Sequence, residues 1–154
     1  ICACLVGSEM CIRDSSQAMR SREIHRTYQA FALGETAASG TIDAPIARLN
    51  GSLIQRTVDF ASGERSVTHY RTLAHCSVFS HLELNLETGR THQIRVHMAY
   101  IGHPLLGDTL YNKTPGTFPR QALHSASLSF VHPITGEPLN FHAPLPEDMQ
   151  NLLT

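Results

Sequence analysis

The part of the sequence with the clearest chemical potential is residues 86–98, which read Leu-Glu-Thr-Gly-Arg-Thr-His-Gln-Ile-Arg-Val-His-Met. A Thr-Gly turn separates an alternating segment from one with helical spacing, so we expect a strand to lead directly into the start of a helix. The free backbone N–H groups of that helix start, the hydroxyl of Thr91 and the guanidinium of Arg90 would then converge. The pattern predicts a site for an anion, either a phosphate or a carboxylate.

The helix expected after this turn has two chemically different faces. His92 and Arg95 are three positions apart and share one face, whereas Ile94 and Met98 face the core. Thr91 is the predicted N-cap, because its hydroxyl can accept a hydrogen bond from the first helical turn. An alternative is that the arginines only form surface ion pairs, which contribute little to stability. The spacing alone leaves both interpretations open.

The composition limits the classes of function. The chain has 12 basic and 13 acidic residues, so it lacks the strong positive field of many nucleic-acid-binding proteins. Lys113 is the single lysine, and the arginines that make up the rest have a planar fork that suits phosphates, carboxylates and base edges. The ten histidines include no HExxH pattern, and the four cysteines form no CxxC pair. We therefore expect no metal site.

The strands and helices expected around the anion site indicate an α+β domain with a mostly antiparallel sheet and flanking helices. Leucines at 82, 84 and 86 alternate with polar residues, which is typical of a half-buried strand. Gly102 and Pro104 are expected to end the helix. The expected strands are residues 28–33, 67–73, 81–87, 123–132 and 139–143, with an edge or irregular crossing at 40–48, a hairpin turn at 133–137 and a short helix at 147–153.

Residues 1–15 and 16–154 are expected to have different origins. Residues 5–15 have neither helical nor strand periodicity, and they resemble one translated frame of the transposase adapter used to prepare sequencing libraries. We therefore expect residues 1–15 to be a non-native tail, followed by a domain that opens within a helix at 16–24. A natural disordered tail is the alternative. Sequencing the locus from genomic DNA decides between the two.

Residues 86–98, together with residues 102–108 and Tyr111, resemble the RluA family of RNA pseudouridine synthases. The phrases Val-Thr-His-Tyr-Arg and Leu-Glu-Thr-Gly-Arg-Thr-His-Gln-Ile-Arg are most similar to the RluD-type branch, which acts on large-subunit ribosomal RNA. The resemblance covers nearly everything from about Gln17 onward. It extends through Pro-Ile-Ala-Arg at 45–48, Gly-Glu-Arg-Ser-Val-Thr-His-Tyr at 63–70, Arg-Gln-Ala-Leu-His at 120–124, His-Pro-Ile-Thr-Gly-Glu at 132–137 and Ala-Pro-Leu-Pro at 143–146.

This resemblance implies the pseudouridine synthase catalytic fold and the isomerisation of a flipped uridine, without metal or cofactor. The glycosidic bond breaks, the base turns, and it is rejoined through carbon five. Arg95 matches the family arginine that ion-pairs with the catalytic aspartate, and a guanidinium suits that task because its fork fixes both charge and orientation. Tyr28 matches the tyrosine that stacks on the base and is a candidate for moving its carbon-five proton. The expected substrate-binding residues are Arg90, Thr91, His92, Gln93 and Ile94.

The sequence departs from the family at the catalytic aspartate, because its motif Arg-Leu-Asp-x-x-Thr-Ser-Gly does not occur in the 154 residues. Asp43, Asp59 and Asp108 match other family positions, so none of them is expected to replace it. Gly107 and Asp108 are interpreted as a structural turn. We expect the N-terminal half of the catalytic domain to be missing and the chain as written to be inactive.

Two other classes of function remain for comparison. One is a noncatalytic RNA-binding or ribosome-assembly module that uses the face of Arg90 and Arg95, although the near-zero net charge weakens it. The other is a histidine-based hydrolase, for which the sequence offers no serine or cysteine nucleophile motif. The expected partner is RNA, with large-subunit ribosomal RNA favoured. We expect a cytoplasmic monomer without a membrane segment.

Overall fold

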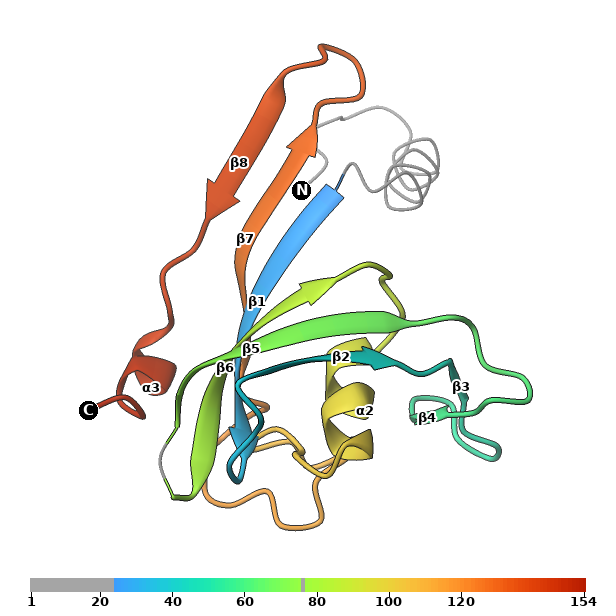
Figure 1. Ribbon diagram of the computed structural model, residues 1–154, viewed down its shortest axis with the longest axis vertical. Coiled ribbons are helices and arrows are strands. Elements are labelled where there is room, and N and C mark those ends of the chain that lie inside the picture. The colour runs from blue at the N-terminus through green and yellow to red at the C-terminus, as the bar shows by residue number, and fades with distance from the viewer. Residues whose placement is uncertain (1–23, 76) are drawn as a thin grey trace.

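The computed structural model describes residues 24–75 and 77–154 (Figure 1). The predicted non-native tail at 1–15 lies outside these residues, as does the helix expected at 16–24 except for Ile24, which is the first residue of a strand. Two helices and eight strands are present in the described part. They are β1 (Ile24–Leu33), β2 (Ser39–Asp43), β3 (Ile46–Arg48), β4 (Arg56–Val58), β5 (Val67–His75), β6 (Phe79–Leu86), α2 (Gln93–Tyr100), β7 (Leu123–Val131), β8 (Pro138–His142) and α3 (Glu147–Gln150).

Six strands form one sheet in the order β2-β5-β6-β1-β7-β8, and every neighbouring pair is antiparallel. This confirms the expected α+β fold with a mostly antiparallel sheet. The β3–β4 pair forms a separate two-stranded sheet beside α2, at the opposite end of the molecule from β8 (Figure 1). For residues 40–48 we expected an edge or irregular crossing, and β2 is indeed an edge strand of the main sheet. The β3–β4 pairing was not expected, because strands of three residues are too short for a periodic signal.

The sheet separates two hydrophobic cores, since side chains alternate between its faces. On one face Ala30, Ala32, Leu82 and Leu84 pack against Ile94 and Met98 of α2, and all six are at most 4% exposed. On the other face Phe31 packs with Ala122 and with Met149 of α3. Burial of each large side chain of this kind contributes about 1.5–3 kcal/mol. The predicted core positions at residues 82, 84, 94 and 98 are thus confirmed.

The five predicted strands are present, and the largest difference is in β1, which begins at Ile24, four residues before the expected start. The expected strand at 81–87 begins two residues earlier, at Phe79, and the strand at 67–73 continues to His75. The helix at the C-terminal end, expected at 147–153, is the four-residue α3. No helix within residues 24–75 or 77–154 is long and apolar enough to cross a bilayer.

Candidate functional site

The turn between β6 and α2 is organised by the side chain of Gln93, which is 2% exposed. Its Oε1 accepts hydrogen bonds from the Thr88 hydroxyl, at 2.8 Å, and from the Arg90 N–H, at 3.0 Å. Its Nε2 donates to the Val67 carbonyl, at 2.9 Å, and to the Thr68 hydroxyl, at 3.0 Å. Because these four bonds use the whole capacity of an amide, Gln93 fixes the turn and has none left for a ligand.

His92, and not Thr91, occupies the N-cap position of α2, which corrects the prediction from the sequence. His92 has a φ of 57° and is the one non-glycine residue in the described part with positive φ. Thr91 is exposed, and no side-chain hydrogen bond caps the helix. The physical reason is that the Gln93 N–H, which a Thr91 hydroxyl would have bound as a cap, already donates to the Arg90 carbonyl, at 3.1 Å. A left-handed conformation at a histidine is strained, and such strain gathers at functional sites.

Arg95 makes a bidentate ion pair with Asp108. The Arg95 Nε donates to Oδ2 and its Nη2 donates to Oδ1, both at 2.7 Å. The Asp108 side chain is fully buried and the Arg95 side chain is 14% exposed. Burial raises the pKa of the Asp108 carboxyl, but hydrogen bonds from Arg95 and from the backbone outweigh this, so the pKa lies below its ordinary value. The hydrogen bond with Asp108 in turn raises the pKa of Arg95.

The turn that carries Asp108 begins at Gly107, which has a φ of 72°. A Cβ atom at this position would lie 1.9 Å from the carbonyl oxygen of Arg120, so no other residue fits. Asp108 Oδ1 also accepts hydrogen bonds from the N–H groups of Leu110, at 3.0 Å, and Tyr111, at 3.2 Å. This confirms residues 107 and 108 as a structural turn and adds the ion pair that the sequence analysis did not foresee.

Tyr111 connects the two polar residues on the outer face of α2. The Arg95 guanidinium carbon lies 5.0 Å from the centroid of the Tyr111 ring, a cation–π contact. The Tyr111 hydroxyl is 2.8 Å from His92 Nδ1 and accepts a hydrogen bond of 2.9 Å from the Arg56 N–H. The pKa of His92 is lowered by burial and by the charges of Arg95 and Arg56, so the neutral imidazole is favoured. These contacts confirm that His92 and Arg95 share a face.

His97, on the inner side of the same helix, is completely buried. Its Nε2 donates to the Ala44 carbonyl, and its Nδ1 lies 2.8 Å from the Thr68 hydroxyl, which also accepts from Gln93. Burial lowers the pKa of His97. A continuous chain of hydrogen bonds therefore joins α2 to β5 and to the segment between β2 and β3.

The other predicted site residues lie at different depths. Arg90 pairs with Glu64 at the surface and also donates to the Arg65 carbonyl, at 3.4 Å. Ile94 is 4% exposed and belongs to the core. Tyr28 lies on the sheet face that α2 covers and packs against the same core cluster as Ile94. In the described part of the chain no hydrogen bond joins Tyr28 to Arg95.

A sheet irregularity adjoins Tyr28. Between Thr27 and Tyr28 the pairing of β1 with β7 shifts register, because Thr27 pairs with Ser127 and Tyr28 with Ser125. Ala126 of β7 is thus an extra residue, a β-bulge. Bulges of this kind turn a neighbouring side chain to a new direction and are frequent beside active sites.

Sequence reasoning included Tyr111 only in the family resemblance, and it missed both the contact of Tyr111 with Arg95 and the role of Asp108 as the partner of Arg95. The available signal was an acid directly after a glycine in an otherwise apolar stretch, Pro104 to Gly107, where a carboxylate needs a cation.

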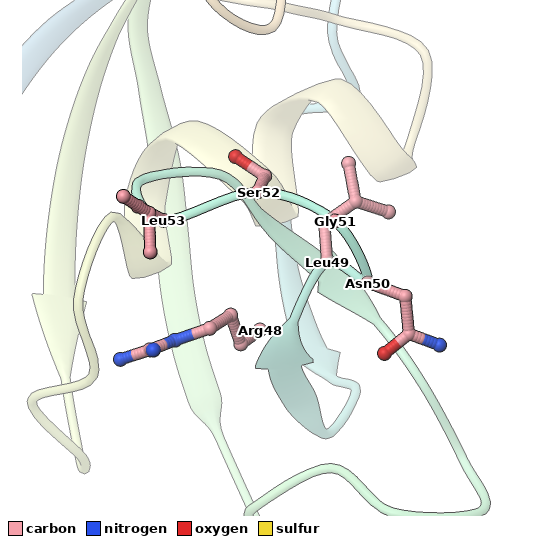
Figure 2. Close-up of a pocket in the computed structure, with 6 residues that line it drawn as sticks. All are labelled: Arg48, Leu49, Asn50, Gly51, Ser52 and Leu53. Carbon is pink, nitrogen blue, oxygen red and sulfur yellow. The ribbon is translucent and has the colours of Figure 1, made fainter.

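A separate open pocket lies on the β3–β4 connection, and in Figure 2 the Arg48 guanidinium and the Asn50 amide extend in opposite directions from it. Its lining is Arg48, Leu49, Asn50, Gly51, Ser52 and Leu53.

The sequence profile of the RNA pseudouridylate synthase family matches residues 7–100. The chain is 50% identical over 139 residues to a protein of Bacillus subtilis named uncharacterized RNA pseudouridine synthase YjbO, covering 90% of this chain and 49% of that protein. It is 47% identical over 149 residues to ribosomal large subunit pseudouridine synthase D of Vibrio cholerae, covering 86% of this chain and 45% of that protein. For the Escherichia coli K12 protein of the same name the identity is 44%, covering 89% of this chain and 46% of that protein.

Among solved structures, the human RNA pseudouridylate synthase domain containing 1 matches with a TM-score of 0.74 and 25% identity, covering 89% of this chain and 61% of that one. Human RNA pseudouridylate synthase domain containing 4 has the same TM-score at 20% identity, which supports the fold alone. The chain spans about half the length of the curated relatives that it matches. With the family profile covering more than half of the sequence, and with this fold, the chain belongs to the RNA pseudouridylate synthase family.

Proposed function

We propose that this chain supplies the arginine-bearing part of an enzyme that isomerises uridine to pseudouridine in large-subunit ribosomal RNA. The observation that carries the proposal is Arg95, a partly exposed guanidinium held in one orientation at the start of a helix. The proteins named ribosomal large subunit pseudouridine synthase D, at 44–47% identity, support the choice of substrate. Ribosomal RNA as the substrate is consistent with the expected cytoplasmic location.

Each proposed role follows from the side chain's position. Arg95 would hold the catalytic carboxylate ionised and aimed, because a guanidinium offers two donors in a fixed plane. Tyr28 would stack on the flipped uracil from the same side of the sheet, while Ile94 contributes to the apolar wall beneath it. Arg90 and Thr91 would contact phosphates, which their exposure supports.

The catalytic carboxylate would come from upstream sequence, since the family motif that carries it does not occur in these residues. The chain as written is therefore expected to release no tritium from RNA that contains uridine labelled at carbon five. The longer protein obtained by joining the upstream codons of the genomic locus is expected to release it. Release by the chain alone would contradict the assignment of the nucleophile.

A substitution in the longer protein tests Arg95 itself. Arg95→Met should lower the rate of tritium release by about 100-fold or more, because the carboxylate loses its charged partner. Arg120→Met is the matched control, since Arg120 makes a similar bidentate pair with Asp148 away from α2. Equal activity of the two variants would contradict the role of Arg95. Salt-dependent RNA binding without any modified base in the wild-type protein would instead favour a noncatalytic RNA-binding module.

A further inference from the structure

The two edges of the Arg95 guanidinium differ in what they contact. The edge formed by Nε and Nη2 is occupied by the two oxygens of Asp108. One face of the guanidinium lies over the Tyr111 ring. Within residues 24–75 and 77–154, no hydrogen bond is formed by Nη1. The ion pair thus leaves one side of a positioned guanidinium without a hydrogen-bond partner among the described residues.

Asp108 is held more firmly than an ion-pair partner needs to be. Its Oδ1 accepts from Arg95 Nη2 and from the N–H groups of Leu110 and Tyr111, and its Oδ2 accepts from Arg95 Nε. The tight turn at Gly107 fixes the backbone. The side chain is also fully buried. The carboxylate is therefore a fixed support, against which Arg95 takes a single orientation.

The Tyr111 side chain is also held in position by its neighbours. Its hydroxyl accepts the Arg56 N–H and lies 2.8 Å from Nδ1 of His92, so two further groups hold the end of the ring. Residues from β4, from the start of α2 and from the turn after Gly107 thus meet around one ring that lies against Arg95.

We propose that Asp108, with Tyr111, is a positioning residue: it occupies the Nε–Nη2 edge of Arg95 and so directs the Nη1 side toward the reacting carboxylate. This inference rests on the proposed function. It also has a consequence for charge. Because Asp108 already balances Arg95, the second carboxylate would receive hydrogen bonds from a neutral pair and not from an unbalanced cation, and so would remain a better base or nucleophile.

The test in the longer protein is Asp108→Asn, which keeps the shape and removes the charge. We expect kcat to fall by about 10-fold to 100-fold while KM stays within about threefold, because the lost interaction acts on the reacting groups. The acidic limb of the kcat–pH profile should move to lower pH, because the reacting carboxylate then faces an unbalanced Arg95. Asp108→Glu should recover part of the activity. Asp148→Asn is the matched control and should change neither kcat nor the profile.

A purely structural role would give a different result. In that case Asp108→Asn would lower the amount of folded enzyme, but the pH profile of the remaining activity would match that of the wild type. An unmoved acidic limb would therefore overturn the proposal.

A second measurement on the present chain does not depend on activity or on a folded variant. In ¹⁵N-resolved NMR spectra, the Arg95 Nε–H should exchange with water at least about 10-fold more slowly than that of Arg48, because a buried ion pair protects it. Exchange as fast as that of Arg48 would overturn the role of Asp108. A longer wild-type protein that shows no isomerase activity would contradict the proposed function, so the two failures are distinguishable.

Discussion

Asp108 and Asp148 each accept two hydrogen bonds from one arginine, through the same Nε and Nη2 atoms. Their surroundings differ, since the side chain of Asp108 is fully buried and that of Asp148 is 35% exposed. Removing one partner of a buried pair leaves an uncompensated charge, whereas an exposed pair is replaced by water at little cost. Individual residues of identical chemistry thus contribute very differently to stability.

Asp108→Ala is expected to lower the free energy of unfolding by about 3–5 kcal/mol, because Arg95 loses its partner in a poorly solvated place. Asp148→Ala should lower the free energy of unfolding by at most about 1 kcal/mol. Urea denaturation of both variants, followed by circular dichroism, measures the difference. Similar losses in the two variants would show that the Arg95 pair is solvated, in contrast to its burial here.

At the scale of elements, the start of α2 is stabilised by one amide side chain and not by a conventional cap. Gln93 links the 88–92 turn to β5 by hydrogen bonds. The Thr68 hydroxyl of β5, which accepts one of them, also forms a hydrogen bond with His97. The strained backbone of His92 is kept in place by this network and by Tyr111. The helix start and the sheet therefore form one rigid unit that carries Arg95.

Gln93→Met is expected to lower the free energy of unfolding by about 2–4 kcal/mol, since several buried polar groups lose their partner at once. Thr91→Ala should change it by no more than about 0.5 kcal/mol, because the exposed Thr91 caps nothing. Amide hydrogen exchange in α2 should also accelerate in Gln93→Met alone. A loss of about 1 kcal/mol or more in Thr91→Ala would instead restore Thr91 as the N-cap.

For the whole molecule, the histidines connect stability to pH. The pKa values of His81, His92 and His97 are lowered mainly by burial. Each is more easily protonated in the unfolded chain, whose histidines titrate near 6.5. The unfolded state then binds more protons below that pH, so the stability that is fully present above about pH 6.5 is lost as the pH falls toward the folded pKa values.

The free energy of unfolding should therefore decrease from pH 7.5 to pH 5, by up to about 1.4 kcal/mol per pH unit for each such histidine. His97→Gln should be less stable at pH 7.5 but should have a smaller slope, because one of the three groups is gone. His142→Gln, at an exposed position of β8, is the control and should keep the wild-type slope. An unchanged slope in His97→Gln would show that His97 does not contribute to the pH dependence.

The sequence by itself determined five of the six strands of the main sheet, the helix after residue 91, its buried residues Ile94 and Met98, and the shared face of His92 and Arg95; β2 was expected only as an edge or irregular crossing. These features repeat with a period of two or 3.6 residues, so each is encoded within a short window. The family resemblance was likewise readable from residues 86–98.

Only the tertiary structure decided which groups meet across long separations. Gln93 contacts Val67, Tyr111 contacts Arg56, and Arg95 contacts Asp108 through partners on different elements. No local pattern specifies such pairs, because they depend on how the sheet, the hairpin and the 107–111 turn pack against one another. The N-cap prediction was wrong for the same reason. A local rule favoured the Thr91 hydroxyl, but the turn is held by the buried Gln93 amide, which is anchored to the distant strand β5.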